Sequence, residues 1–357
     1  MIRRGFYGRS HSLRSFSLRS ISIWIQTIWE FAEREDIPKL VGVVVAIIFT
    51  SSILLYWVEP DVSFVDSLWW SLVTLTTVGY GDITPVTFAG RCIAAVDMLV
   101  GIGILAILTA KIASTLIERK NRENLGMTSY YHQDHMILCE WNYRSQTILK
   151  ELRHELRTQT LPVVLIANID HKPVDDNYLF FVKGDVTDTT LMQANLPEAD
   201  TVIILGDDTL EDRNRDAKVI LSTLTVESIN PDAYTVVELV SKAHASTCKR
   251  ANADEVIVRD EMSSRMLLNT ALNHGMSSVV MELLCHQYGN QLGKSKASEH
   301  HIDQRFIDVL LDVKKTSQSI LIGIQQGENG EVLSNPDAGY KIQPEDLLIL
   351  IRPGQQQ

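Results

Sequence analysis

An uncharged run of 19 residues, Leu40–Val58, constrains the fold of this 357-residue chain more than any other feature. A helix of that length, rising about 1.5 Å per residue, measures about 28 Å, close to the hydrocarbon thickness of a bilayer. Tyr56 and Trp57 end the run with side chains that anchor helices at a membrane interface. A buried core helix is the alternative, but the length and the absence of charge favour a transmembrane span over residues 40–58 in a lipid bilayer.

A second apolar stretch, residues 88–117, is long enough to span a bilayer but carries Asp97 and Lys111. Basic residues are distributed unevenly around the two spans. Seven precede the first span, four lie in or just after the end of the second, and Arg91, near the start of the second, is the only one from residue 40 to residue 110. Because cytoplasmic segments are enriched in lysine and arginine, we expect a multi-pass protein of the cell (plasma) membrane with both termini in the cytoplasm.

Residues 1–37 form a basic N-terminal segment. Within it, residues 20–33 place isoleucines and tryptophans on one helical face, which predicts an amphipathic helix on the inner leaflet. An unstructured basic tail is the alternative for residues 1–19. The whole chain has a net charge of −11, so we expect no nucleic-acid partner. We also expect no enzymatic activity.

The stretch between the spans begins with "SFVDSLWWSLVTLTT", in which Ser63 and Asp66 form a capping-box pattern. This pattern predicts a helix over residues 65–76. The helix is too short to cross a membrane, so it can enter one only where protein neighbours satisfy the backbone that follows it. We therefore expect a re-entrant pore helix.

The residues that follow, "TVGYGD", resemble the selectivity filter of potassium channels. The resemblance implies that backbone carbonyls from Thr77 to Tyr80, with the Thr77 hydroxyl, replace the water shell of a K+ ion. Glycine at two positions permits the backbone angles that aim successive carbonyls at one axis. It also implies a homotetramer, with filter residues Thr77, Val78, Gly79, Tyr80, Gly81 and Asp82 supported by Trp69 and Trp70.

One filter between two spans indicates a two-helix pore domain over residues 38–118. Neither span carries arginine or lysine at every third position, which excludes a voltage sensor. Related potassium transporters keep only one glycine of the filter, whereas this chain keeps both, Gly79 and Gly81. The resemblance therefore favours a channel over a transporter.

The second span contains Gly101 and Gly103, which soften a helix locally. In related channels a glycine at the position of Gly101 is the gate hinge, and close helix packing is the alternative. Asp97 lies one turn earlier. It either faces the cavity, where four carboxylates would bind internal cations and cause rectification, or lies behind the pore helix near Ser71 or Thr74. Relatives usually carry an apolar residue there, so a replaced natural residue is a third interpretation.

After a charged linker, residues 119–134, strands and helices alternate over residues 135–260, which predicts a parallel, doubly wound, Rossmann-like sheet. Within it, "VKGDVTDTTLMQANLPEADTVII" is similar to the domains that regulate potassium conductance, known as RCK, KTN or TrkA-N domains. The resemblance implies a helix–turn–helix dimerisation segment over residues 261–289 and a small β-rich C-terminal lobe over residues 290–357. From residue 38 onward, the chain is similar to the calcium-gated two-helix channels of archaea.

The expected ligand site departs from the dinucleotide pattern. A dinucleotide fold places glycines after the first strand, but this chain has Glu140, which would repel phosphate. Asp170 stands where a ribose-binding acid belongs, and Arg144 with its helix N-terminus is a candidate for an adenine nucleotide. NAD or an adenine nucleotide therefore remains a weaker alternative as ligand.

Calcium or another divalent cation is the other candidate, because it prefers clustered carboxylates. Glu238 on the fifth strand matches an acid of the calcium-gated relatives, but Val240 replaces the next one. Asp207 and Asp208 follow the fourth strand and are candidate replacements, with Glu238 and Asp207 as predicted metal ligands. A solvated helix start is the alternative explanation for these aspartates. Histidines at positions 132, 135, 300 and 301 are candidates for a transition metal, with ordinary surface histidines as the alternative.

The sequence therefore predicts a ligand-gated potassium channel with a tetrameric pore opened by a cytoplasmic RCK gating ring. A ring of eight RCK domains would need four soluble copies, which an internal start at Met127 could supply. Two alternatives remain: a membrane-anchored, non-conducting nucleotide or metal sensor, and a regulatory subunit of a potassium transporter.

Overall fold

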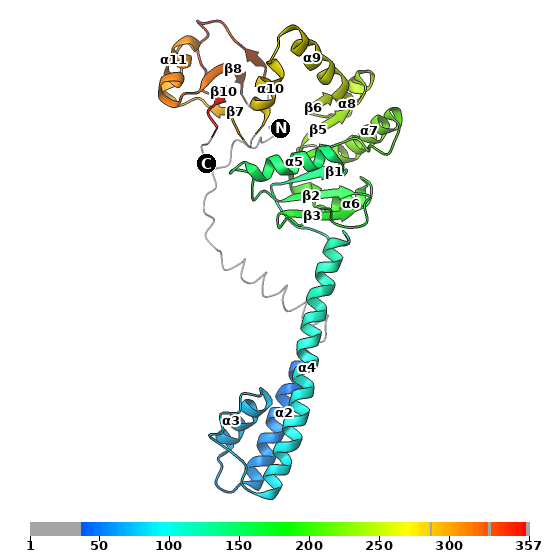
Figure 1. Cartoon of the computed structure of the whole chain (residues 1–357), viewed down its shortest axis with the longest axis vertical. Coiled ribbons are helices and arrows are strands. Elements are labelled where there is room, and N and C mark those ends of the chain that lie inside the picture. The colour runs from blue at the N-terminus through cyan, green and yellow to red at the C-terminus, as the bar shows by residue number, and fades with distance from the viewer. Residues whose placement is uncertain (1–36, 286–287, 328–329, 355–357) are drawn as a thin grey trace. The chain divides into compact units, whose positions relative to one another are not determined.

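The computed structural model describes residues 37–285, 288–327 and 330–354, and the predicted amphipathic helix over residues 20–33 lies outside them (Figure 1). The described chain divides into two compact units, one ending at Asn121 and the other beginning at Arg122. We describe the first as the pore unit and the second as the regulatory unit.

The pore unit contains α2 (Ile37–Val58), α3 (Phe64–Leu75) and the first part of α4 (Phe88–Asn124). Both α2 and α4 contain stretches long and apolar enough to cross a membrane. The predicted second span ended at residue 117, but α4 continues to Asn124 because the charged residues that follow are good helix formers. Ser63 caps α3 by accepting a hydrogen bond from the Asp66 backbone N–H at 3.2 Å, as the capping pattern predicts.

The three helices of the pore unit meet through buried apolar and polar contacts. Leu55, Trp70 and Ala94, one residue from each helix, form a buried apolar cluster. Small hydroxyl side chains join α2 to α3, with Ser51 Oγ 2.5 Å from Ser71 Oγ. These contacts hold α3 against α2.

The regulatory unit begins with a six-stranded parallel sheet in the order β3-β2-β1-β4-β5-β6, which confirms the predicted Rossmann-like fold. Two buried apolar clusters pack on this sheet. The strand order reverses between β1 and β4, which is the place where such sheets bind ligands. The strands are β1 (His135–Cys139), β2 (Val163–Ala167), β3 (Leu179–Lys183), β4 (Ala199–Ile204), β5 (Tyr234–Leu239) and β6 (Glu255–Val258), and the helices are α5 (Tyr143–His154), α6 (Asp188–Gln193), α7 (Asp212–Ile229) and α8 (Ala245–Arg250).

Two helices, α9 (Arg259–Leu272) and α10 (Met276–Leu284), follow the parallel sheet. A turn over residues 273–275 separates them, in which Gly275 precedes α10 with a φ of 85° that glycine adopts without strain. The turn lies within residues 261–289, where the resemblance implies a helix–turn–helix.

An antiparallel sheet in the order β7-β10-β8-β9 forms the small C-terminal lobe, or C-lobe, and the predicted β-rich lobe is thereby confirmed. Its helix α11 (Phe306–Ser317) buries Phe306, Val309 and Val313 in the core of this lobe. The strands are β7 (Gln291–Lys296), β8 (Ile320–Gln326), β9 (Val332–Ser334) and β10 (Asp346–Arg352), and a 3-10 turn, η3 (Glu299–His301), precedes α11.

Candidate functional site

The loop that follows α3 has an alternating backbone. Positive φ angles occur at Thr77 (61°), Gly79 (58°) and Gly81 (74°), every second residue of the predicted filter. In an ordinary strand, successive carbonyls point to opposite sides, and a left-handed residue at every second position turns them toward one side. The backbone N–H groups of Val78 and Gly79 both donate to Val73 O, at 3.0 and 3.3 Å, and so fasten the loop to α3.

The two tryptophans of α3 have different surroundings. Trp69 Nε1 donates a hydrogen bond to Asp82 Oδ2 at 2.8 Å, and the Trp69 ring stacks on Tyr80 with 6.0 Å between centroids. Trp70 is 4% exposed and is buried between the helices with Leu55 and Ala94. Trp69 therefore holds both ends of the "YGD" segment, while Trp70 fixes the position of α3.

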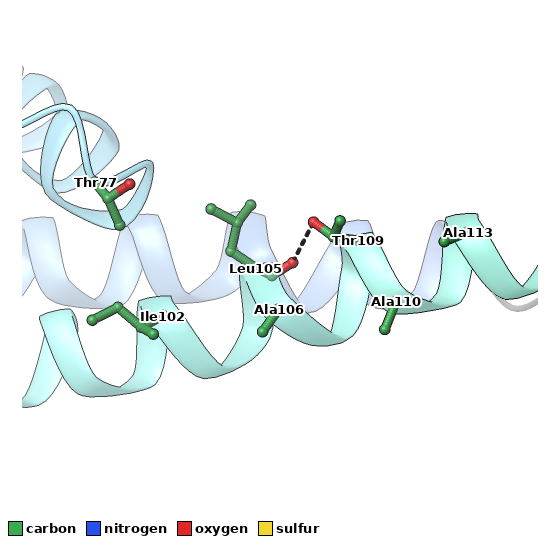
Figure 2. Close-up of a pocket in the computed structure, with 7 residues that line it drawn as sticks. All are labelled: Thr77, Ile102, Leu105, Ala106, Thr109, Ala110 and Ala113. Carbon is green, nitrogen blue, oxygen red and sulfur yellow. Dashed lines mark hydrogen bonds between the residues drawn. The ribbon is translucent and has the colours of Figure 1, made fainter.

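An open hollow of about 460 Å3 lies below Thr77, along α4. Figure 2 shows Thr77 facing Ile102 and Leu105 across this space. The Thr109 hydroxyl donates to Leu105 O at 2.9 Å, so that α4 satisfies its own polar side chain here. The wall is otherwise mostly small and apolar, with Ala106, Ala110 and Ala113 completing it.

Asp97 is not among the residues that line this hollow. It is 4% exposed in the single chain, and Ser51 is its polar neighbour. Gly101, one turn further along α4, lies against Leu75 at the end of α3, where a Cβ would come within 2.9 Å of Leu75 Cδ1. Gly103 has open space around it. Of the two placements of Asp97 and the two roles of Gly101, the geometry favours burial behind α3 for Asp97 and close packing for Gly101.

Glu59 is a structural residue of the pore unit that sequence reasoning missed. Its side chain is 2% exposed, and Oε1 accepts hydrogen bonds from the Thr87 backbone N–H at 2.9 Å and the Thr87 hydroxyl at 2.8 Å. Burial raises its pKa, but the bonds from Thr87 outweigh burial and leave the pKa below its usual value. The carboxylate thus joins the end of α2 to the start of α4, where a negative charge is favourable.

A second cluster, the sheet-edge cluster, lies at the carboxyl ends of β1, β4 and β5. Arg144 is at its centre: Nε donates to Glu238 Oε2 at 2.8 Å, the two terminal nitrogens donate to Asp208 at 2.9 Å each, and Nη2 donates to Gly206 O at 3.0 Å. Burial disfavours the charged guanidinium, but its two carboxylate partners outweigh this effect and raise the pKa of Arg144. The Arg144 bond also lowers the pKa of Asp208.

Lys218 on α7 organises the other half of the cluster. Its ammonium lies 2.7 Å from Glu140, 2.8 Å from Asp185 and 2.9 Å from Asp207. Burial raises the pKa of Glu140 and Lys218 opposes this rise. The sequence did not indicate Lys218, which lies in no recognisable motif, and it gave no role to Asp185, although Asp185 lies in the motif that begins "VKGD".

The loop after β1 is already internally bonded. Glu140 adopts a left-handed φ of 75°, the kind of backbone that glycine supplies in a dinucleotide site. The Asn142 side chain accepts hydrogen bonds from the backbone N–H groups of Arg144 and Ser145, at 2.9 and 3.1 Å. These amides would otherwise be free to bind phosphate at the start of α5.

The structure therefore brings Arg144, Glu238, Asp207 and Asp208 together, but not Asp170. Asp170 pairs with Lys183 at 2.9 Å, and its side chain is 88% exposed. The Lys183 bond lowers the pKa of Asp170. Its position at the end of the second strand follows from the sheet, but its exposure places it on the open surface.

Two protein-family models match the chain, "Ion channel" over residues 43–118 and "TrkA-N domain" over residues 136–259. They coincide with the pore unit and with the parallel sheet. The chain therefore combines an ion-channel domain with a TrkA-N domain, and its homologues are potassium channels, which supports the class of ligand-gated potassium channels.

The match to two relatives covers almost the whole length of each. The chain is 28% identical to the protein YugO of Bacillus subtilis over 318 residues, covering 87% of this chain and 94% of YugO. It is 26% identical to the "Calcium-gated potassium channel TvoK" of Thermoplasma volcanium over 330 residues, covering 89% and 92%. A solved structure of the human SLO3 gating ring matches in fold, with a TM-score of 0.54 at 16% identity, covering 66% of this chain and 50% of that one.

Proposed function

We propose that four copies of the chain form a potassium-selective pore in which residues 77–82 are the filter. The observation that carries the proposal is the alternation of positive φ angles at Thr77, Gly79 and Gly81. Carbonyl oxygens turned to one side, with the Thr77 hydroxyl below them, can replace the hydration shell of a K+ ion. A single chain supplies one wall of such a filter, and a closed ring of carbonyls requires symmetric copies.

The exposure of the loop supports a homotetramer. Val78 is 54% exposed and Tyr80 is 68% exposed in the single chain, which is unusual for such side chains beside a rigid loop. Neighbouring copies around an axis next to Thr77 would cover them. The hollow below Thr77 would then become part of a shared cavity beneath the filter.

The membrane orientation follows from charge. The basic residues outside the spans would lie in the cytoplasm of a cell whose plasma membrane holds α2 and α4. Asp82 and Glu59 would then lie toward the outer face, and the regulatory unit would be cytoplasmic.

We propose that the gating ligand is calcium or another divalent cation, bound at the sheet-edge cluster. Two carboxylates, Glu238 and Asp208, and the carbonyl of Gly206 converge on Arg144, and oxygen atoms of this kind are the ligands that Ca2+ prefers. In the described structure the guanidinium satisfies these oxygens. Binding would therefore require displacement of Arg144, and this displacement is the local change that we propose to be transmitted to the pore.

NAD or an adenine nucleotide is less well supported. Phosphate would have to displace Asn142 from the first amides of α5 and would meet Glu140 close by. Both groups oppose an anion at the start of this helix.

The gating ring would assemble through α9 and α10. Leu267, Leu272 and Met281 on these helices are 72%, 73% and 60% exposed, so that each chain presents an apolar surface suited to a second copy. We propose eight RCK domains, four of them from soluble chains started at Met127. Met127 precedes the parallel sheet and forms an antiparallel bridge to Val182, so a chain starting there keeps the whole lobe.

Single-channel recording in a planar bilayer tests the function. Potassium bathes one face and sodium the other, and calcium is titrated on the face of the regulatory unit. The proposal expects a reversal potential set by potassium and an open probability that rises with calcium. Potassium-selective openings indifferent to calcium would overturn the ligand assignment, and the absence of current from folded, reconstituted tetramers would favour a non-conducting sensor or a transporter subunit.

A further inference from the structure

Two adjacent histidines and an aspartate converge in the C-lobe. They are distant in sequence from residues 77–82 and from the sheet-edge cluster. His301 Nε2 lies 2.9 Å from Asp312 Oδ2, and His300 Nε2 lies 3.5 Å from the same oxygen. The three possible ligand atoms all lie within 4.8 Å of one another. Among the described residues, no other set of three histidine, cysteine or acidic side chains brings its ligand atoms so close. We call these residues the His–Asp cluster.

The buried histidine is held from behind. His301 is 6% exposed, and its Nδ1 lies 2.8 Å from the Ser298 hydroxyl. A metal-binding histidine typically donates its second ring N–H to such a partner, which fixes the ring and leaves the other nitrogen for the metal. His301 therefore already has the orientation of a ligand, with Nε2 directed at the shared point.

The backbone places the three side chains on two rigid elements. His300 and His301 end the turn η3, which the His301 N–H closes by donating to Ser298 O at 2.8 Å. Asp312 lies on α11, whose apolar face is buried in the core of the C-lobe. The imidazole rings of the two histidines are 3.9 Å apart between centroids, so both reach the carboxylate from one side.

The other histidine pair that the sequence singled out lacks this geometry. The rings of His132 and His135 are 6.4 Å apart, and His135 Nε2 is bonded to Ala194 O at 2.8 Å. Phe180 packs against His132 with 4.1 Å between ring centroids. This pair belongs to the core of the parallel sheet.

We propose that His300, His301 and Asp312 form a binding site for a first-row divalent metal ion, with zinc the expected ion. Two imidazoles and one carboxylate are a nitrogen-rich set that suits Zn2+ and Co2+ rather than Ca2+ or Mg2+. Water would complete a four-coordinate site. The metal would replace the protons between the imidazoles and Asp312, and it would fasten η3 to α11.

Cobalt titration of the full-length protein tests the site directly. The protein is purified without a polyhistidine tag, stripped with chelator and titrated with Co2+, because a tetrahedral cobalt site has a strong visible absorption. We expect one such site per chain in the unaltered protein, and its absorption should disappear when Zn2+ is added. The exposed ligand variants His300→Asn and Asp312→Asn should each weaken binding by more than about 100-fold, beyond the loss typical of outer-shell changes.

Two further variants separate a built site from adventitious binding. Ser298→Ala removes only the group behind His301 and should weaken cobalt binding by about 10- to 100-fold. Asp308→Asn, one turn earlier on α11 and paired with Arg305 at 2.8 Å, should leave binding unchanged. No tetrahedral cobalt spectrum, or equal binding by the His300→Asn and Asp308→Asn proteins, would overturn the proposal. Neither result depends on whether the pore conducts.

Discussion

Arg144 Nε lies 2.8 Å from Glu238 Oε2, and the same guanidinium is bonded to both oxygens of Asp208. The chain therefore holds its own cation at the point where the acids expected of a divalent site converge. Removal of either carboxylate would leave the partly buried guanidinium short of a partner, which is destabilising. An incoming cation would have to displace the Arg144 guanidinium before it could bind these two carboxylates.

Arg144→Ala should increase the sensitivity of this site to calcium. The change releases Glu238 and Asp208 without altering their own chemistry, so Ca2+ would no longer compete with a guanidinium. We expect the dissociation constant of calcium to fall by at least about tenfold, since about 1.4 kcal/mol of lost competition suffices. Because displacement of Arg144 is the proposed signal to the pore, opening of this variant should depend less on calcium. Recording in planar bilayers and calorimetric titration of the full-length protein measure the two effects.

A matched control for this variant is Arg153→Ala. Arg153 is paired with Asp176 at 2.7 Å, on the same lobe but outside the sheet-edge cluster. Its removal should leave the calcium response unchanged. An Arg144→Ala channel with the calcium response of the unaltered protein would contradict the assignment of the ligand to this cluster.

Trp69→Phe should loosen the outer end of the filter. Phenylalanine keeps an aromatic ring beside Tyr80 but cannot donate the bond that Trp69 Nε1 makes to Asp82 Oδ2 at 2.8 Å. We expect shorter openings and a K+ to Na+ permeability ratio lowered several-fold, measured from reversal potentials. The Trp57→Phe protein is the control, because Trp57 is 79% exposed at the end of α2. Equal selectivity and open times in the two variants would remove this role from Trp69.

Glu59→Gln should change the response of the pore unit to acid. The bonds from Thr87 hold the pKa of Glu59 below its usual value in the folded protein. A group with a lowered pKa stabilises the fold above its unfolded value, near 4.3, and that stabilisation is lost as the pH falls through the folded value. Protonation of Glu59 removes this stabilisation, so the melting temperature of the unaltered protein should decrease as the pH falls below about 4.

The Glu59→Gln protein should be less stable than the unaltered protein at pH 7 and should lose less on acidification. Melting temperatures of detergent-solubilised protein from pH 7 to pH 3 give this comparison. Asp61→Asn, which changes a nearby exposed acid, controls for general charge effects. Parallel melting curves for Glu59→Gln and the unaltered protein at all pH values would show that the contact to Thr87 carries no pH-dependent stability.

Asp97→Leu should leave block by internal cations unchanged. The carboxylate is 4% exposed within a single chain and does not line the hollow below Thr77, so it is poorly placed to attract magnesium or a polyamine. Recording with internal Mg2+ or spermine measures the block. Thr109→Leu is the comparison, because Thr109 does line the hollow and should alter it. Relief of block in Asp97→Leu alone would restore the cavity interpretation.

The features that the sequence predicted are those that depend on residues close together in the chain. The uncharged run of α2 and the alternating β-α pattern each depend on neighbouring residues, and so do the left-handed glycines of the loop after α3. The contacts that Lys218 makes within the folded domain were not predictable in the same way. Lys218 meets Glu140 only because α7 and the end of β1 lie together in the folded sheet, and no short pattern records that proximity.

The contact between Glu59 and Thr87 was missed for a similar reason: the two residues are 28 positions apart and meet only when α2 and α4 pack. The sequence could not decide which way the Asp97 side chain faces. Successive residues of a helix point in directions about 100° apart, and the apolar residues of α4 allow more than one of its faces to pack against α3. The burial of this side chain needed the packed helices.

Gly101→Ala and Gly103→Ala separate a packing role from a hinge. A Cβ on Gly101 would lie 2.9 Å from Leu75 Cδ1 and 3.3 Å from Leu75 Cα, so the Leu75 side chain would have to move and the end of α3 would have to give by a few tenths of an ångström, whereas a Cβ on Gly103 meets nothing within 4 Å. Alanine is otherwise favoured over glycine within a helix by about 1 kcal/mol. We therefore expect Gly103→Ala to raise the melting temperature of the solubilised protein and Gly101→Ala to lower it, with disturbed selectivity because Leu75 leads directly into the filter. If Gly101 acts only as a hinge, Gly101→Ala would instead keep stability and selectivity and reduce the open probability.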